Sequence, residues 1–466
     1  MKALDNLCVV VPVTSNAEKR SLTSPECDSV EEFAMSTPAA TNVASINLAD
    51  PEVHLRGEHH ELLRILRREA PVHYFPGDAH FQPFWSITRY EDVMHVSRNP
   101  QLFSSEGGIS ILPTMDAEGG YGSGDAPPAF TGAAKMLIMM DPPRHVRLRR
   151  LVNKGFTPRA VSMMETKVRE ITRGLLDRVD GKGDIDFVVE LAAQLPLAVI
   201  CSMMGVPEKD FDLMFRITNK ILGAGDPEYQ DEVPPELRGT REGARLTGQS
   251  GFMQAFGYFS QVLQELRAGK RGDDIASILV DSEIDGEKLS DEEVLLFCFL
   301  LILAGNETTR NAISGGMLVL SDHPEQKAML ASDPSLMPIA VEELLRWTSP
   351  VTHMTRVAIA NTEIHGQPIA AGERVCMWYP SVNRDEDIFP DPYRFDITRT
   401  PNDHLAFGIG EHFCLGAGFA RLELRVMFEE LLARFPKAEV SGPPERLRSN
   451  FLGGIKHLPV TLGSPR

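Results

Sequence analysis

The sequence predicts a mainly α-helical fold with small β-sheets, and three observations support this. Amphipathic periodicity predicts helices over Glu61–Arg68, Pro143–Phe156, Thr166–Val179, Val188–Met204, Phe252–Arg267 and Phe419–Phe435. The apolar run Val294–Gly305 has the length of a buried helix and is too short to span a bilayer. Alternating apolar and polar residues predict a strand at Phe84–Thr88 and a small sheet over Thr362–Tyr379.

The domain organisation follows from composition along the 466 residues. Residues 1–45 mix Ser, Thr, Ala, Pro and charges without periodicity, which predicts a disordered N-terminal extension. Residues 46–466 read as a single domain without internal repeats. Ser104–Ala134 is rich in glycine, and a loop of that length inside a compact domain is usually functional or disordered.

Charge and cysteine usage narrow the function class. The net charge of −18 argues against general affinity for nucleic acid or anionic membranes. Six widely spaced cysteines without a CxxC pair argue against a disulfide framework or a zinc site and fit a reducing cytoplasm. We find no secretory signal and no membrane span, so we expect a cytoplasmic protein, and we expect a monomer.

The stretch Phe407–Gly416, with the sequence FGIGEHFCLG, contains the strongest chemical signal. Its glycines allow a tight turn close to a flat ligand, and Cys414 directly precedes a predicted helix. Backbone N–H groups at a helix start stabilise an anionic sulfur, and a thiolate on haem iron favours O–O cleavage. A lone cysteine is more often a small buried apolar residue, and only the whole pattern outweighs that alternative.

This stretch resembles the haem-binding signature of the cytochromes P450, FxxGxxxCxG with a basic residue two positions before the cysteine. Phe407, Gly410, Cys414 and Gly416 match its fixed positions, and His412 takes the basic place. The resemblance implies a P450 fold in which haem b lies between a long distal helix and a proximal cysteine loop. It also implies that Cys414 is the axial iron ligand, that His412 contacts a haem propionate and that Phe407 packs beside the sulfur.

The predicted distal helix begins at a capping box, Ser290 with Glu293, and turns polar after its apolar run. Small Ala304 and Gly305 leave room for a ligand, although a solvated helix face is the plain alternative. The sequence AGNETT resembles the P450 oxygen-activation motif. The resemblance implies that Thr308, whose hydroxyl can bond to the preceding turn, acts in oxygen activation and that Glu307 supplies protons.

Two further motifs match the same family. Glu343 and Arg346 form an ExxR pair, which is most often a surface pair but here implies a buried structural network completed by Arg394. The segment from Asp141 to Arg159 resembles DPPxHxxxR followed by FTPR. By that resemblance the haem propionates bind a set of cations: His145, Arg149, Arg356 and, as a weaker candidate, His404.

The helix that carries His145 is also basic outside the propionate positions. Its further cations are Arg144, Arg147, Arg150 and Lys154. These cations form either a solvated face or a docking patch for an acidic electron donor. A local basic cluster stands out in so acidic a protein, which is the reason to consider a docking patch.

The substrate prediction depends on a mostly apolar lining. The resemblance places around the pocket Leu300, Leu301, Ala304, Gly305, Val351, Thr352, Met354, Phe451 and Leu452. The alternative for each residue is plain core packing, but together they favour an apolar substrate such as a terpene, a steroid or a methyl-branched lipid.

The family resemblance implies a monooxygenase that inserts one atom of O₂ into an unactivated C–H bond. A ferredoxin and its NAD(P)H reductase would supply two electrons. Alternatives are a peroxygenase or desaturase on the same fold, a haem sensor or carrier, and a helical binding protein without haem. The Glu307–Thr308 pair disfavours a peroxygenase and a mere carrier, and four motifs in family order disfavour the last alternative.

Overall fold

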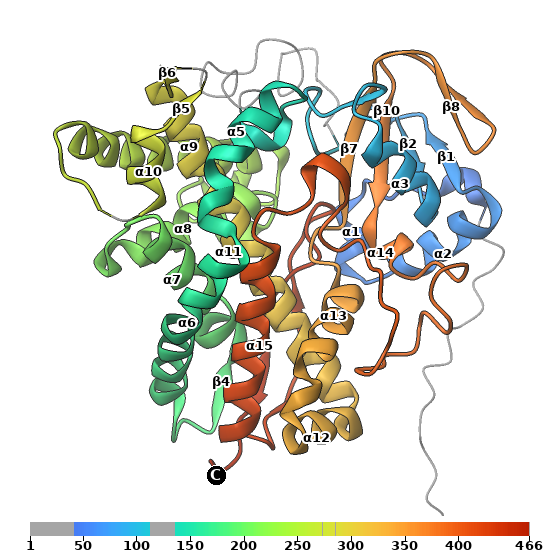
Figure 1. Cartoon of the computed structure of the whole chain (residues 1–466). Coiled ribbons are helices and arrows are strands. Elements are labelled where there is room, and N and C mark those ends of the chain that lie inside the picture. The colour runs from blue at the N-terminus through green and yellow to red at the C-terminus, as the bar shows by residue number, and fades with distance from the viewer. Residues whose placement is uncertain (1–41, 112–135, 273, 285, 466) are drawn as a thin grey trace, which may run out of the picture. The chain divides into compact units, whose positions relative to one another are not determined.

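A computed structural model of the chain describes residues 42–111, 136–272, 274–284 and 286–465 (Figure 1). The predicted N-terminal extension falls outside this part of the chain, apart from a 3₁₀ turn at Val43–Ser45. Most of the glycine-rich loop also lies outside the described residues. Among the helices that are described, none combines the length and the apolar character needed to cross a membrane.

Helices form most of the described structure, as predicted. Their bounds are α1 Pro51–Leu55, α2 His59–Glu69, α3 Tyr90–Arg98, α5 Arg144–Val152, α6 Pro158–Val179, α7 Gln194–Met203, α8 Phe211–Leu222, α9 Arg241–Arg267, α10 Ile275–Asp281, α11 Asp291–Asp322, α12 Pro324–Ser332, α13 Met337–Thr348, α14 Tyr379–Val382 and α15 Ala417–Arg434.

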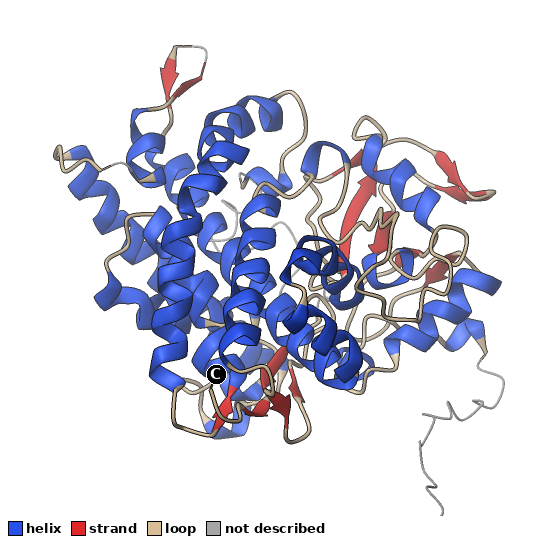
Figure 2. Ribbon diagram, turned by 60° about the horizontal axis from the view of Figure 1, so that its bottom comes forward, coloured by secondary structure: helices blue, strands red, loops and turns tan. Residues whose placement is uncertain are grey.

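The strands form small sheets beside the helices (Figure 2). The largest sheet has the order β1-β2-β10-β7-β3, in which β10 pairs parallel with β2 and antiparallel with β7. Its strands are β1 Val72–Phe75, β2 Phe84–Ile87, β3 Phe103–Ser104, β7 His353–Ala358 and β10 Arg374–Trp378. The shorter strands are β4 Asp184–Asp186, β5 Glu283–Ile284, β6 Glu287–Lys288, β8 Thr362–Ile364, β9 Gln367–Ile369, β11 Glu439–Val440, β12 Glu445–Arg446, β13 Ile455–His457 and β14 Pro459–Thr461.

Helix α11 runs through the centre of the helical region and contacts α7, α8, α9, α13 and α15 (Figure 1). Its start confirms the predicted capping box, because Ser290 accepts from the Glu293 N–H and Glu293 accepts from the Ser290 N–H. Three acidic residues in the first turn add a favourable interaction with the helix dipole. Apolar residues of α11 are buried in two separate core clusters, so this helix organises the interior.

Helix α9 begins earlier than the sequence predicts. We expected a helix from Phe252, but the structure starts it at Arg241, where the Thr240 side chain accepts from the Gly243 N–H. The added turns contain Gly248 and Gly251 and many polar residues, so their hydrophobic periodicity is weak. Packing against α8 stabilises them, since Gly251 lies directly against the side chain of Lys220.

Candidate functional site

Cys414 lies in a short loop between a 3₁₀ turn at Gly410–His412 and helix α15. Its backbone N–H donates to the carbonyl of Phe407 over 3.0 Å, which closes the loop. Burial raises the pKa of the Cys414 thiol, while the N–H groups of Gly416 and Ala417 oppose this by bonding the sulfur. The loop thus offers a free thiol with backbone donors that favour its anionic form.

Gly410 lies in the predicted tight turn and also faces helix α3. Its φ of +75° suits glycine, and a Cβ atom there would lie 2.5 Å from the carbonyl oxygen of Ser97 in α3. The glycine is therefore required for the turn and for the cysteine loop to pack against α3, while its close approach to a flat ligand stays a prediction.

Helix α5 also fixes the cysteine loop, through Arg149. The Arg149 guanidinium donates to the carbonyl of Glu411 over 2.8 Å and to the carbonyl of Phe413. Behind the loop, the guanidinium of Arg421 lies 4.5 Å from the ring centre of Phe407. Both faces of the loop are therefore held by arginines, which limits movement of the sulfur.

His145, Arg149, Arg356 and His412, hereafter the cation cluster, are brought together from α5, β7 and the cysteine loop. The rings of His145 and His412 are 4.2 Å apart. Burial, with repulsion from the neighbouring cations, lowers the pKa of His145 to about 4 and that of His412 to about 3. Asp141 is the carboxylate that acts on His145, and it is already bonded by the Ser104 hydroxyl and the Ser105 N–H.

The cation cluster fits the two carboxylates of haem. Within the described part of the chain, neither ring nitrogen of the buried His145 has a hydrogen-bond partner. Arg356 is 7% exposed, and its guanidinium donates to the carbonyl of Thr355, not to a carboxylate. Burial and mutual repulsion disfavour the charged forms of the two imidazoles, and the buried Arg356 guanidinium has no bond to a carboxylate of the described residues, so an anionic group is the natural occupant of this region.

The centre of α11 opens onto a space. Ala304 is exposed, and Thr308 is partly exposed, although the intervening Asn306 and Glu307 are buried. The Thr308 hydroxyl donates to the carbonyl of Ala304 over 2.9 Å, which confirms the predicted bond to the preceding turn. An exposed alanine in the middle of the central helix indicates room for a ligand against that face.

Gly305 does not belong to this open face. A Cβ atom there would lie 3.0 Å from the side chain of Ile200 in α7. The missing side chain therefore permits close packing of α11 against α7, and the predicted role of Gly305 in leaving room for a ligand is wrong.

Glu307 is buried beside the open face and forms an ion pair with Arg310 on the next turn of α11. Among the described residues its second oxygen, Oε1, has no hydrogen-bond partner. Burial raises the pKa of Glu307, and Arg310 opposes that rise. Arg310 was missed at the sequence level, although its spacing of three residues from an acid on a helix was the available signal.

The ExxR pair is buried. Arg346 donates to both carboxylate oxygens of Glu343 over 2.7 Å, and neither side chain is exposed. Arg346 also donates to the carbonyls of Asn383 and Pro392. The pair thus connects α13 to the segment that leads toward the cysteine loop.

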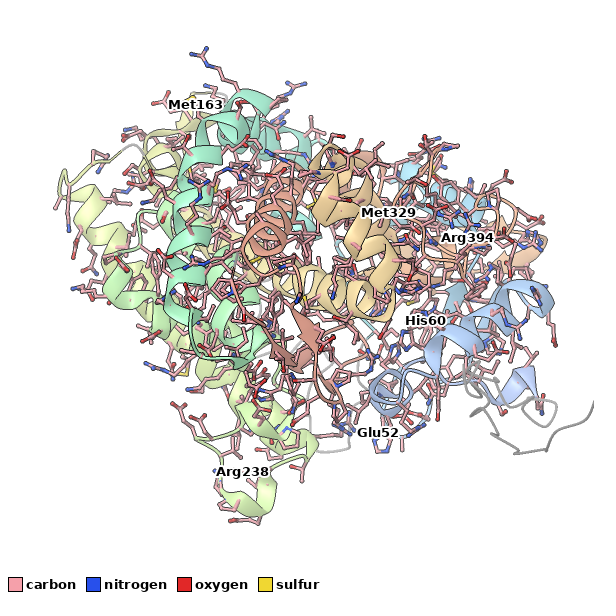
Figure 3. All side chains as sticks on the ribbon, turned by 90° about the horizontal axis from the view of Figure 1, so that it is seen from below. Glu52, His60, Met163, Arg238, Met329 and Arg394 are labelled. Atoms are coloured by element: carbon pink, nitrogen blue, oxygen red, sulfur yellow. The ribbon has the colours of Figure 1, made fainter. Side chains whose placement is uncertain are left out.

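Two predicted partners lie elsewhere. Arg394 is 68% exposed, pairs with Asp396 and lies at the surface (Figure 3), so its predicted place in the buried network is wrong. Arg399 takes that place, 8% exposed and 3.2 Å from Glu343. His404 bonds Glu342 at 3.2 Å and is not part of the cation cluster, so its candidacy for a propionate is not supported.

The predicted pocket residues occupy two regions. Leu300 and Leu301 lie on α11, while Val351 forms an isolated bridge with Leu452. The Thr352 N–H donates to the carbonyl of Phe451 over 3.0 Å, and Met354 is partly buried on β7. The segments around Val351 and Phe451 are therefore adjacent, and their lining of a substrate pocket stays a prediction.

The basic residues of α5 and of the turn after it are largely exposed. Arg144 pairs with Glu293 of α11 at 2.8 Å. The side chains of Arg147, Arg150 and Lys154 are exposed. Phe413 of the cysteine loop, whose carbonyl accepts from Arg149, is 41% exposed.

Comparison with known proteins supports these observations. The sequence model of the cytochrome P450 family, whose members carry haem with a thiolate ligand, matches residues 114–456. A methyl-branched lipid omega-hydroxylase of Mycobacterium bovis is 42% identical, over 85% of this chain and 89% of its own. A steroid C26-monooxygenase of Mycolicibacterium smegmatis is 35% identical, over 91% and 95% of the two chains.

Comparison with solved structures leads to the same family. A Mycobacterium marinum cytochrome P450 in complex with pseudoionone superposes with a TM-score of 0.80 at 35% identity, covering 90% of this chain and 98% of that one. Bacterial enzymes of this type depend on redox partners and act on apolar substrates. The matched motifs, the fold and the near-complete coverage of these relatives show that this chain belongs to the cytochrome P450 family, and that it is a monooxygenase of apolar substrates.

Proposed function

We propose that this chain binds haem b through Cys414 and hydroxylates an unactivated C–H bond of a terpene, a steroid or a methyl-branched lipid. The observation that carries the proposal is the open face of α11, where Ala304 and Thr308 border a space and Glu307 is buried beside them. We further propose that it acts as a cytoplasmic monomer with O₂ and two electrons.

Four cations would hold the cofactor in place. His145, Arg149, Arg356 and His412 would bind the two propionates, and Arg149 would also keep its bonds to the cysteine loop. When bound, the haem supplies the oxygen-activating chemistry that thiolate ligation favours.

The chain itself would control protons and water. The Thr308 hydroxyl, now bonded to the Ala304 carbonyl, can accept a proton and donate one toward the open face. Glu307 is the adjacent buried acid, and its Oε1, which has no hydrogen-bond partner in the part of the chain that the structure describes, is the proposed atom from which a proton passes toward Thr308. Apolar side chains around this face would limit water and keep the proton supply ordered.

The relatives support the substrate class. A methyl-branched lipid omega-hydroxylase, a linalool 8-monooxygenase of Pseudomonas putida and the steroid C26-monooxygenase together span branched lipids, terpenes and steroids. The methyl-branched lipid enzyme shares 42% identity, against 36% for the linalool enzyme, so branched lipids are the first class to test.

An acidic ferredoxin with its NAD(P)H reductase is the proposed electron source. Exposed Arg147 and Arg150 lie on α5, the helix that also holds the cysteine loop through Arg149, and exposed Lys154 lies in the 3₁₀ turn Asn153–Phe156 that follows it. A cationic surface at this place would attract an acidic partner to the side of the molecule nearest the sulfur.

The first experiment is the spectrum of the reduced holoprotein with carbon monoxide. Thiolate-bound haem gives a strongly red-shifted Soret band, and Cys414→Ala should lose it while Cys376→Ala, which changes a buried cysteine of β10, keeps it. A normal band in Cys414→Ala would overturn the ligand assignment.

The second experiment tests the reaction. Phytanic acid, linalool and testosterone are added to the ferric protein, and a spin-state shift followed by a hydroxylated product identifies the substrate class. Thr308→Ala should consume electrons but release mainly peroxide. Tight coupling in that variant would contradict the role of Thr308.

A further inference from the structure

His353 is a fully buried histidine of β7 that bonds the backbone of two segments far apart in the sequence. Its Nε2 atom accepts from the N–H of Ile111 over 3.2 Å, in the described part of the glycine-rich loop. Its Nδ1 atom lies 3.1 Å from the carbonyl oxygen of Asn450, in the loop between β12 and β13. A buried ring that is satisfied from two sides fixes the distance between the segments that it bonds.

The two partners of His353 permit one tautomer. The Ile111 N–H can only donate, so Nε2 carries the lone pair, and the Asn450 carbonyl can only accept, so Nδ1 carries the hydrogen. Burial, together with repulsion from His54 and Arg374, lowers the pKa of His353 to about 3, although the bond to Asn450 opposes this. The neutral ring and both of its bonds therefore persist above about pH 3.

Other side chains hold these two segments separately. The Thr355 hydroxyl bonds two carbonyls of segment 107–111, at 3.0 and 3.2 Å. The Thr352 hydroxyl donates to the carbonyl of Asn450 and lies 3.4 Å from Nδ1 of His353. His353 bonds both segments, so it fixes them relative to each other and not only relative to β7.

The ring of His353 also contacts two aromatic side chains. Its centre lies 5.3 Å from that of Phe451, with the ring planes inclined by 72°. Its centre lies 5.0 Å from the indole of Trp378 in β10, whose N–H donates to the Ser86 hydroxyl over 3.1 Å. Edge-to-face contacts favour one orientation of the two rings. His353 thus connects a fixed part of the core to Phe451, one of the residues predicted to line the substrate pocket.

We propose that His353 is a positioning residue for substrate recognition, which joins segment 107–111 to the loop between β12 and β13 and thereby orients the ring of Phe451. The inference rests on the proposed function and on the predicted place of Phe451 at the pocket. His353 acts through Phe451 and needs no contact with the substrate. Binding of a ligand large enough to reach Phe451 should therefore depend on His353, whereas binding of a ligand that contacts only the iron should not.

Two amide side chains separate the two bonds of His353. Asparagine places its amide near the position of Nδ1, so His353→Asn keeps a donor for Asn450 and loses the bond to Ile111. Glutamine reaches the position of Nε2, so His353→Gln keeps an acceptor for Ile111 and loses the bond to Asn450. Hydrogen exchange of the Ile111 amide should be about tenfold faster in His353→Asn and unchanged in His353→Gln. Both variants lack the ring that contacts Phe451.

The functional readout is the affinity of the ferric holoprotein for two azoles that ligate haem iron, measured from the shift of the Soret band. Imidazole is small and reports on the iron site, while clotrimazole is bulky and fills the space beside it. The Kd for clotrimazole should rise about fivefold in both His353 variants, while the Kd for imidazole stays unchanged. Phe451→Ala should also raise the Kd for clotrimazole. Adding His353→Asn to Phe451→Ala should raise it no further, because His353 acts through Phe451.

His54→Asn is the matched control. His54 is a buried histidine of α1 whose ring stacks on Trp378 at 5.9 Å and whose Nε2 bonds the carbonyl of Leu48. This variant also removes a buried imidazole beside Trp378, but it leaves the contact between His353 and Phe451 in place. Its Kd for clotrimazole should equal that of the unchanged protein, and a rise as large as in His353→Asn would reduce His353 to a packing residue.

The outcomes separate this inference from the proposals beneath it. If Phe451→Ala leaves the Kd for clotrimazole unchanged, the predicted place of Phe451 is wrong and the inference falls with it. If Phe451→Ala raises that Kd but the His353 variants do not, or if the two effects add, the role of His353 is overturned. Equal exchange of the Ile111 amide in both His353 variants would overturn it as well. Neither azole requires turnover, so a failure to hydroxylate any substrate would count against the proposed reaction alone.

Discussion

Two buried groups of arginines and histidines differ in how their charges are compensated. In the ExxR network, Glu343 sits between Arg346 and Arg399 and also accepts from Asn402, so the chain supplies its own counter-charge. In the cation cluster, Arg356 is buried without a carboxylate bond among the described residues, and burial lowers the pKa of the neighbouring His145 to about 4. A group balanced by the chain contributes to folding, whereas an unbalanced group indicates a ligand from outside.

The largest expected effect comes from breaking the balanced group. Glu343→Gln leaves Arg346 and Arg399 uncompensated in the interior, and we expect a loss of about 3–5 kcal/mol in the free energy of unfolding. The loss should be equal with and without haem. Chemical denaturation measures it, and Glu58→Gln is the control, because its ion pair with Arg56 is half exposed and should contribute less than about 1 kcal/mol. A small loss at Glu343 would contradict the folding role.

Arg356→Leu tests the unbalanced group. It removes a buried cation, so the free energy of unfolding of the haem-free protein should stay the same or increase. Haem retention should fall at least about tenfold, because one charge-assisted bond to a carboxylate is lost. Haem transfer to apomyoglobin measures retention. If Arg356→Leu destabilises the haem-free protein as strongly as Glu343→Gln does, the contrast between the two groups is false.

The exposed cations of α5 and of the turn after it should affect the rate of electron transfer rather than the stability of the fold. Replacing Arg147 and Lys154 by alanine should slow reduction by an acidic ferredoxin about tenfold at low salt. The difference should shrink at high salt, because screening weakens attraction between exposed charges. Stopped-flow reduction measures this, with Arg178→Ala and Lys209→Ala as controls at other exposed positions. An effect of the same size in those controls would refute a docking site on α5.

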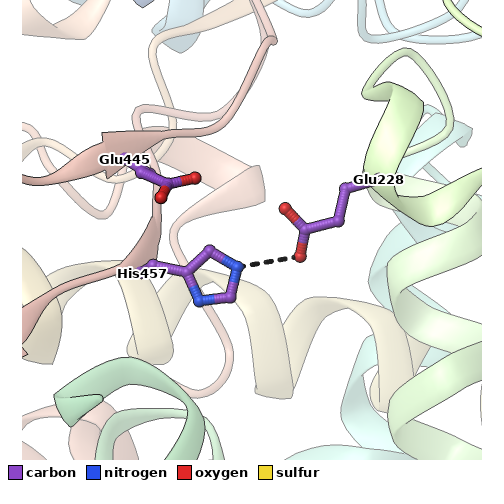
Figure 4. Close-up of side chains that lie close together, drawn as sticks. All are labelled: Glu228, Glu445 and His457. Carbon is purple, nitrogen blue, oxygen red and sulfur yellow. Dashed lines mark hydrogen bonds and ion pairs between the residues drawn. The ribbon is translucent and has the colours of Figure 1, made fainter. Parts of the chain in front are cut away.

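The smallest expected effect on the free energy of unfolding comes from a surface group whose charges are compensated by the chain. Asp186 bonds one ring nitrogen of His457. Glu228 bonds the other, and Glu445 lies nearby (Figure 4). Although burial opposes it, these carboxylates raise the pKa of His457 above 6.5. The stabilisation is therefore complete below about pH 6.5 and is lost as pH rises through the folded-state pKa. His457→Gln should cost less than about 1 kcal/mol at about pH 6 and less still at about pH 9.

Urea unfolding at both pH values tests this prediction for His457. Glu228→Gln, which removes one of the two carboxylates, should reduce the pH dependence without reversing it. A cost for His457→Gln that grows with pH would show that the ring is stabilised in its neutral form.

The motifs could be predicted because each is a local pattern with fixed residue types. The capping box at Ser290 and the bond from Thr308 to Ala304 depend on spacing within one helix, and the structure contains both. Glycines were harder: Gly305 and Gly410 were correctly singled out, but the atoms they make room for, in Ile200 and Ser97, are distant in sequence.

Long-range partners could not be predicted from one sequence. Arg394 and Arg399 are five positions apart, and only the path of the chain after α14 decides which of them reaches Glu343. The same holds for the start of α9, whose weak periodicity is offset by packing on α8. The bond between Arg310 and Asn219 joins two helices that no local pattern relates.

The loop between β12 and β13 connects three distant segments of the chain. Arg448 bonds Glu52 and the carbonyl of Gly225, and Asn450 bonds the carbonyl of Ala49 and accepts from Thr352. The same loop carries Phe451 and Leu452. In evolutionary terms, a substitution within these few residues changes the contacts of three distant segments at once. If Phe451 and Leu452 line the substrate pocket as predicted, the shape of the pocket is coupled through this loop to the contacts of Glu52, Gly225 and Thr352.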